Sequence, residues 1–201
     1  MENTNRVTPK DEVTKLDIQV LNQEEVAKFI EKLNKILSKK VSVKTEILDC
    51  AEVTVKDKDG NIKSHHTIID LLTNAGLAQM SALCGNIGSP VAINFLGIGT
   101  GTTAAAVTDT VLQTPVKIKV ATTISQITTS VTNDTLKLSV VFSNAIDSLT
   151  GTSAITEVGA MTAATSYVLL MHQVYTPADN MNWDNGDTYT LTITIQMKQG
   201  T

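Results

Sequence analysis

The acidic side chain with the clearest chemical potential is Glu157, which stands alone in the apolar stretch of residues 153–159. A carboxyl group in such a stretch either belongs to a hydrolase or is hydrogen-bonded near a strand end. Hydrolysis of a glycosidic bond needs two carboxyl groups about 5–10 Å apart. The candidates for the second acid all lie in turn-like segments: Asp147, Asp179, Asp184 and Asp187. The chain also has no Gly-x-Ser-x-Gly nucleophile motif, so we expect Glu157 to be structural and the protein not to be an enzyme.

Three closely spaced glycines, Gly97, Gly99 and Gly101, resemble a nucleotide-binding loop at first sight. A dinucleotide fingerprint needs the spacing Gly-x-Gly-x-x-Gly before a helix, and a P-loop needs a lysine after its last glycine. Here the third glycine comes too early and no lysine follows. We therefore expect no bound cofactor, and instead a strand that runs into a loop where backbones approach closely.

The histidines and cysteines do not form a metal-binding pattern. His65 and His66 are adjacent, so on a strand they point to opposite faces and cannot easily chelate one ion. A zinc site that includes the third histidine, His172, would need further ligands that the sequence does not place. Cys50 and Cys84 form neither a disulfide framework nor a spaced metal motif. We expect no metal, and two thiols that are free or buried as small apolar side chains.

The only tryptophan, Trp183, lies in the polar segment 181–186 together with Asn185. An exposed aromatic loop of this kind can stack on a sugar, which makes Trp183 and Asn185 candidate receptor-loop residues. The alternative, which we favour, is a turn whose tryptophan packs into the core.

The elements that position these residues are mostly β-strands, because apolar residues recur at every second position in several segments of the chain. Residues 188–197 are the clearest case, because Tyr189, Leu191, Ile193, Ile195 and Met197 alternate with threonines. Apolar runs or alternation also predict strands at 41–45, 52–56, 91–98, 116–120, 136–142 and 167–174, turns at 57–61 and 184–187, and a short helix at 74–83. Several short strands separated by polar turns are typical of a mainly β fold, an antiparallel β-sandwich or jelly roll.

One amphipathic helix is expected before the strands. Asn22 can cap it, with Glu24 and Glu25 in the first turn, and its apolar positions recur at helical spacing. The helix either packs on its own domain or serves in oligomerisation or docking. In the second case its contact residues are Val26, Phe29, Leu33 and Ile36.

Charge divides the chain into two regions. Residues 1–66 hold 12 of the 16 Lys and Arg residues and 12 of the 20 Asp and Glu residues. We expect residues 1–50 to be a charged, partly helical docking or oligomerisation region and residues 51–201 to be a Thr-rich β-sandwich body. A surface with so few charges is poorly protected against self-association, so neighbouring proteins are expected to cover much of the body.

The overall charge and hydropathy exclude several classes of protein. A net charge of −4 argues against nucleic-acid binding. No apolar run approaches the ~20 residues of a membrane-spanning helix, and the first residues lack the pattern of a signal peptide. We therefore expect synthesis in the cytoplasm and no membrane partner.

A set of ordered segments in the body carries a resemblance to a known family. The segments are 55–60, 66–69, 73–78, 95–104, 109–112, 155–160 and 186–191. Their order and spacing resemble those of virion structural proteins of tailed bacteriophages, of the tail-fibre, head-fibre or minor structural jelly-roll type. The resemblance covers about residues 52–197, and residues 1–50 do not match the pattern.

The resemblance implies a non-enzymatic virion protein that assembles on the phage particle as a head or tail accessory, fibre or decoration component. Its expected location is the virion, after synthesis in the host cytoplasm. Its expected partners are other virion proteins and further copies of itself, in a homo-oligomer for which a trimer is one candidate. The alternative function is a carbohydrate- or receptor-binding module of a virion.

Overall fold

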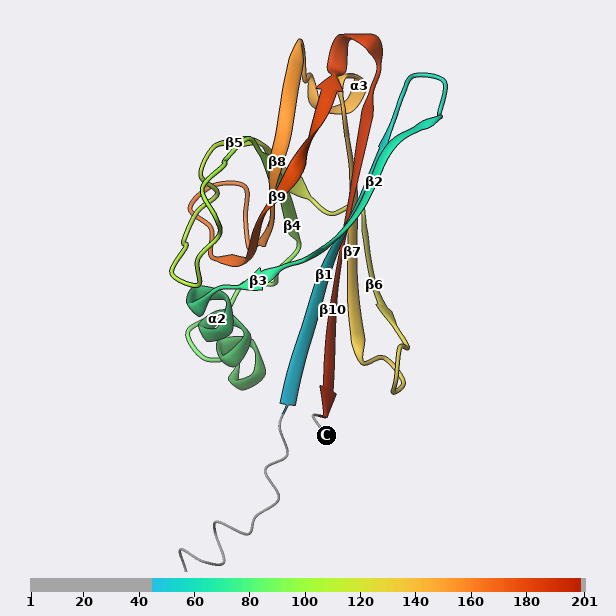
Figure 1. The fold of residues 1–201 in the computed structure, drawn as a ribbon. Coiled ribbons are helices and arrows are strands. Elements are labelled where there is room, and N and C mark those ends of the chain that lie inside the picture. Colours follow the sequence, from blue (N-terminus) through green and yellow to red (C-terminus); the bar gives the residue numbers. More distant parts are fainter. Residues whose placement is uncertain (1–44, 200–201) are drawn as a thin grey trace, which may run out of the picture. The chain divides into compact units, whose positions relative to one another are not determined.

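The fold comes from a computed structural model, which describes residues 45–199 (Figure 1). The helix predicted from residue 22 onward lies outside the described residues. So do its predicted contact residues, Val26, Phe29, Leu33 and Ile36.

The described chain is mainly β. Its strands are β1 (Thr45–Lys56), β2 (Ile62–Ile69), β3 (Leu71–Leu72), β4 (Phe95–Gly99), β5 (Pro115–Val120), β6 (Thr123–Ile127), β7 (Thr135–Ser143), β8 (Thr152–Met161), β9 (Leu169–Asn182) and β10 (Thr188–Gln199). Its helices are α2 (Asn74–Gly85), α3 (Asn144–Asp147) and the 3-10 helix η1 (Trp183–Asn185).

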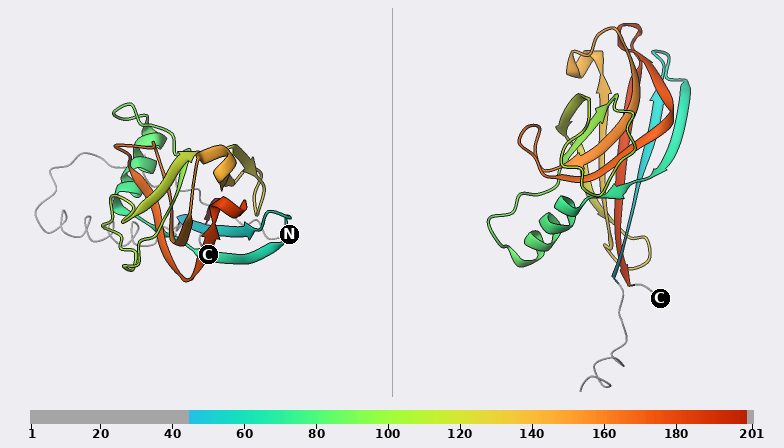
Figure 2. Two further views of the ribbon diagram at one scale, coloured as in Figure 1. Left: turned by 90° about the horizontal axis from the view of Figure 1, so that it is seen from above. Right: turned by 60° about the vertical axis from the view of Figure 1, so that its left-hand side comes forward.

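The strands form two five-stranded antiparallel sheets. Sheet A has the order β2-β1-β10-β7-β6, and sheet B has the order β3-β9-β8-β4-β5. The strand β10 lies in the middle of sheet A, paired with β1 and β7 over nearly its whole length. Figure 2 shows the two sheets from two further directions.

The alternation predicted for β10 gives this strand an apolar face, and that face packs against sheet B. Tyr189, Leu191 and Ile193 are fully buried and belong to one apolar cluster with residues of sheet B such as Ile98 and Val158. The inner faces of both sheets therefore share a core, which is the arrangement of a β-sandwich. The predicted fold class is confirmed.

Several boundaries differ from those predicted. β1 is one continuous strand from Thr45, because Ile47 and Asp49 keep the inward alternation of Ala51. The sheet thus begins inside the region 1–50 that the sequence assigned to docking. Residues 91–94 are not a strand, and β4 begins only at Phe95. The short strand β6 was not predicted at all.

Helix α2 and the chain that follows it lie beside one end of the sandwich (Figures 1 and 2). Thr73 caps this helix, since its hydroxyl accepts a hydrogen bond from Gly76 N at 2.9 Å and donates one to Leu169 O at 2.5 Å. The cap fastens the start of α2 to sheet B. The rest of the helix and residues 92–94 face the inner surface of sheet A, where they border the cavity described below.

Candidate functional site

A buried histidine between two carboxylates forms the strongest polar cluster in the described chain. His172 on β9 has Nε2 at 2.8 Å from Oε1 of Glu157 and Nδ1 at 2.6 Å from Oδ2 of Asp109. The side chains of His172 and Glu157 are fully buried, and that of Asp109 is 26% exposed. Because both ring nitrogens face carboxylate oxygens, the arrangement fits a doubly protonated imidazolium that donates to each side.

The hydrogen bonds around His172 set the pKa values of the cluster. Burial opposes charge on Glu157, but the bonds from His172 and from the amides of Gln113 and Thr114 outweigh it and lower the pKa of Glu157. Burial likewise disfavours the imidazolium, yet the bonds to Glu157 and Asp109 raise the pKa of His172. The pKa of Asp109 is lowered, chiefly by the amide of Ala106.

The glycine-rich segment is part of this cluster. Gly101 N lies 3.3 Å from Oε2 of Glu157, and the Thr156 hydroxyl donates to Gly101 O at 2.7 Å. A Cβ atom added to Gly99 would collide with Oε2 of Glu157, and one added to Gly101 would come within 2.8 Å of it. Glycine at both positions therefore makes room for the buried carboxylate. The predicted close approach of backbones holds at Gly99, where an added Cβ atom would lie 2.6 Å from Thr114 O.

Glu157 has no oxygen left for a substrate. Oε1 accepts from Gln113 N at 2.5 Å and meets His172, while Oε2 accepts from Thr114 N at 3.1 Å as well as from Gly101. A general acid or base must reach the atom that it protonates or deprotonates, and this carboxylate is enclosed. The geometry therefore fits the second expectation for Glu157, a structural carboxylate that is held by hydrogen bonds.

The acid that shares the cluster is Asp109, which the sequence did not single out. The four predicted partners have other contacts: Asp147 with Lys119, Asp179 with Tyr175, Asp184 with Gly151 N, and Asp187 with Lys63. No local pattern marks Asp109, because it is brought to His172 by a long loop between β4 and β5.

A second polar cluster contains the three residue types of a serine hydrolase triad, but not in that arrangement. Ser64 donates directly to Oδ1 of Asp179 at 2.5 Å, and His66 Nε2 lies 3.0 Å from the same oxygen. In a triad the imidazole stands between the hydroxyl and the carboxylate. Tyr175 donates to the other oxygen of Asp179 at 2.8 Å, so this cluster connects β2 to β9 and has no activated nucleophile.

Two further carboxyl groups, those of Asp49 and Asp70, lie close together in the sandwich, and three of their four oxygens have no hydrogen-bond partner among the described residues. The register Cys50↔Ile69 of β1 and β2 places Asp49 opposite Asp70 at the end of the ladder. Asp70 is 7% exposed, and both of its carboxyl oxygens and Oδ2 of Asp49 have no partner among the described residues. Burial raises the pKa of Asp49 to about 6. The pKa of Asp70 is raised well above its usual range, first by burial and then by the charge of Asp49.

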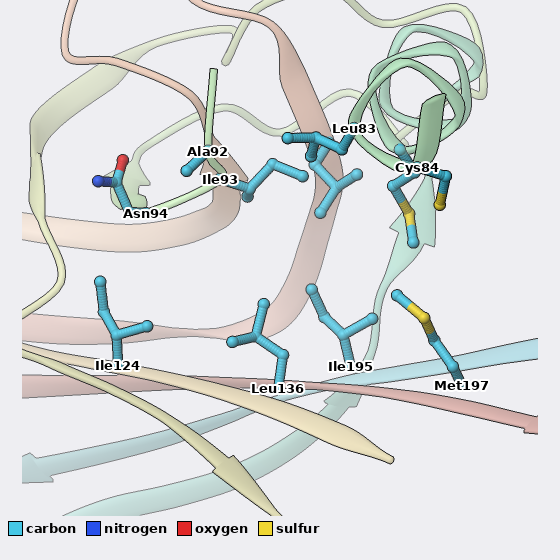
Figure 3. A pocket seen from close by; sticks show the side chains of 11 residues that line it. Leu83, Cys84, Ala92, Ile93, Asn94, Ile124, Leu136, Ile195 and Met197 are labelled. Carbon is cyan, nitrogen blue, oxygen red and sulfur yellow. The ribbon is translucent and has the colours of Figure 1, made fainter. Parts of the chain in front are cut away.

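An apolar cavity of about 340 Å³ opens at the end of the sandwich near α2 (Figure 3). One wall is the inner face of sheet A, and the other is α2 with residues 92–94 and Leu170. Figure 3 shows Ile124, Leu136, Ile195 and Met197 facing Leu83, Cys84 and Ile93 across it. Among the described lining residues, only Asn94 carries a polar amide or hydroxyl group.

The rim of this cavity is accessible to solvent. Ile124 is 51% exposed, Met197 48% and Leu83 37%, and the thiol-bearing residue Cys84 is exposed as well. These side chains come from three separate segments of the chain, so no stretch of sequence predicts the cavity.

The structure does not support Trp183 as a receptor-loop residue. Its side chain is 1% exposed, and its indole N–H donates to the Ser153 hydroxyl at 3.0 Å. The buried position agrees with the alternative favoured from the sequence, a turn whose tryptophan packs into the core. The physical reason is that a large aromatic ring at the end of a sandwich gains more by filling the core than by facing water. Asn185 is exposed in η1, and its backbone N–H donates to the side chain of Asn182.

Comparison with known proteins identifies no relative, since no protein-family model, curated protein or solved structure matches this chain. Among residues 45–199, no helix is long and apolar enough to cross a membrane. In the same part of the chain, no group of three or more His, Cys, Asp or Glu side chains is arranged to hold a metal ion. Cys50 and Cys84 are free thiols.

Replacing Glu157 by glutamine is expected to lower the free energy of unfolding by about 3 kcal/mol, because it leaves a buried imidazolium with one carboxylate. The measurement is urea denaturation near neutral pH. Asp109→Asn is the matched variant, and its loss should be smaller because Asp109 is partly exposed. Equal stability of E157Q and the wild type would show that the cluster contributes nothing.

The same cluster gives the wild type a stability optimum. Its contribution declines as the pH falls below 4.5, the ordinary pKa of a glutamate, through the lowered folded pKa of Glu157. It also declines as the pH rises above 6.5 through the raised folded pKa of His172. In E157Q the free energy of unfolding should therefore change less than in the wild type, both as the pH falls below 4.5 and as it rises above 6.5.

Replacing Asp70 by asparagine is expected to stabilise the protein in alkali. A carboxyl group with a raised folded pKa favours folding in its protonated form, so wild-type stability falls as the pH rises above 3.8 through the folded pKa. At about pH 8, D70N should exceed the wild type by about 1–3 kcal/mol in urea denaturation, and the gain should shrink toward about pH 4. Asp59→Asn, at an exposed turn residue, is the control. A gain independent of pH would contradict the explanation.

Proposed function

We propose that this chain is a non-enzymatic structural protein of a virus particle, which assembles there through contacts with neighbouring proteins. The observation that carries the proposal is the apolar cavity at the end of the sandwich, with its exposed rim. The resemblance of residues 52–197 to tailed-phage virion proteins supports the particle as the place of assembly.

The chemistry of the cavity favours a protein contact over a small polar ligand. Sites for small molecules combine apolar walls with a few polar groups that orient the ligand, and here Asn94 is the only such group among the described lining residues. Burying one leucine or isoleucine side chain is worth about 1.5–3 kcal/mol. We therefore assign as occupant the apolar side chains of an adjacent subunit of the particle.

The polar clusters support a structural protein in a different way. The imidazole of His172 and the carboxylates of Glu157 and Asp179 are all engaged in bonds that join strands or loops. Each such bond fixes the position of a backbone segment, which is useful to a protein that must present a defined surface.

Receptor or sugar binding is less well supported by the geometry. That alternative depended on an exposed Trp183 with Asn185 beside it, and Trp183 lies in the core. Asn185 alone provides no aromatic surface on which a sugar could stack.

Mass spectrometry of purified virus particles tests the proposed location. The particles are isolated from lysates of the source culture by density gradient and washed with high salt and mild detergent. The chain should remain in the particle fraction at a constant ratio to the major capsid protein. Recovery only in the soluble fraction would overturn the virion assignment.

The thiol of Cys84 can report whether assembly covers the cavity. Cys84 lines it and is exposed, while Cys50 is half-buried, so a Cys50→Ser variant carries one accessible thiol among the described residues. Maleimide labelling of Cys84 should be at least tenfold slower in particles than in the free protein. The matched control is Asn185→Cys in a background without other cysteines, at an exposed site away from the cavity. Equal labelling of Cys84 in both states would exclude the cavity as a contact.

A further inference from the structure

The two sheets have four outer strands, and three of these are protected against pairing with another chain. An outer strand exposes unpaired backbone N–H and C=O groups, which natural proteins shield by short length, proline, charge or covering contacts. In sheet B, β3 has only two residues, and β5 begins with Pro115 and carries Lys117 and Lys119. In sheet A, β2 carries Lys63, whose ammonium group donates to Asn180 O at 3.2 Å, so β2 is joined to β9.

The fourth outer strand, β6, has none of these protections. Its five residues, Thr123–Ile127, are uncharged, and the neighbouring residues 121–133 also contain no Asp, Glu, Lys or Arg. Within residues 45–199, β7 is the only strand that pairs with it. Ile124 is 51% and Ile127 36% exposed, so both faces of this strand present an apolar side chain to solvent.

We propose that β6 is a self-association edge, at which it pairs antiparallel with β6 of a second copy and joins the two A sheets into one. The occupant is a second copy because the strand is complementary to itself. An antiparallel pair related by a two-fold axis brings threonine, serine, glutamine and isoleucine opposite one another with no like charges in contact.

The position of Ile124 extends this contact to the apolar cavity. Ile124 belongs to β6 and also lines the cavity, next to Leu136 on β7. Pairing of two β6 strands therefore sets the two cavities on either side of the new junction. The apolar surface of one copy then continues into that of the other.

The pairing is expected to be weak in solution. A contact over five residues falls well below the roughly 1,200 Å² of a stable interface. On a particle with many copies the same weak contact is multiplied by high local concentration. This self-contact rests on the proposed function, because it would be one of the contacts by which the protein assembles on the particle.

Charge on the edge provides the test. The wild-type full chain should show a concentration-dependent monomer–dimer equilibrium in sedimentation equilibrium. The double variant T123K/Q126K, with both substitutions at exposed positions of β6, should weaken dimerisation at least tenfold. The variant I62K/T67K, at exposed positions of β2, is the matched control and should dimerise like the wild type.

A mixture of oppositely charged variants makes the test specific. T123K/Q126K mixed with T123E/Q126E should form a mixed dimer that is at least tenfold tighter than the dimer of either variant alone. Thermal unfolding and circular dichroism establish that each variant is folded. Three results would each overturn the proposed pairing of β6: a wild-type protein that is monomeric at its solubility limit, a wild-type trimer, or a T123K/Q126K dimer as tight as that of the wild type. The two proposals can also fail separately. If the wild type dimerises and T123K/Q126K does not, but the protein is missing from particles, the pairing of β6 is supported and only the virion assignment is overturned.

Discussion

The described fold depends on a buried histidine ring that lies between two carboxyl groups and is hydrogen-bonded to both. His172 belongs to β9, Glu157 to the adjacent β8, and Asp109 to the long loop between β4 and β5. One imidazole ring thus connects two neighbouring strands to a long loop that forms no regular structure. Three backbone amides complete the coordination of Glu157. Because breaking such a cluster leaves an uncompensated charge in the core, the loop has one favoured position and the surface it forms is well defined.

The parts of the fold with strong periodicity were predictable from the sequence. In residues 188–197 of β10 the apolar side chains alternate with threonine or glutamine, so the face that packs into the core could be read directly from the sequence. The Asp-Gly turn at residues 57–61 and the helix at 74–83 also carry local signals, since Gly60 adopts a φ of 85° and Thr73 caps the helix. These features depend only on neighbouring residues.

The candidate sites were less predictable because they depend on distant residues. Asp109 meets His172 only through the course of a loop, and the apolar cavity combines side chains from α2, residues 92–94 and sheet A. The direction of Trp183 could not be decided locally, because a polar turn can place an aromatic ring on either side. β6 was missed because five residues such as Thr-Ile-Ser-Gln-Ile have no distinct hydrophobic face. The self-complementary edge emerges only when its neighbours in the sheet are known.

The two ends of the sandwich are held together by different forces. At the end that includes η1 and α3, Lys63 contacts Asp187 at 2.5 Å and Lys119 contacts Asp147 at 2.6 Å, and the second of these pairs links the two sheets. At the end near α2, the sheets meet around an apolar cavity and the carboxyl groups of Asp49 and Asp70, three of whose four oxygens have no hydrogen-bond partner among the described residues. Local opening follows the weaker contacts, so it is favoured at the end near α2 over the end near η1. The sandwich is therefore closed by ion pairs at one end and by apolar packing alone at the other, so the spacing of the two sheets is less constrained at the end near α2.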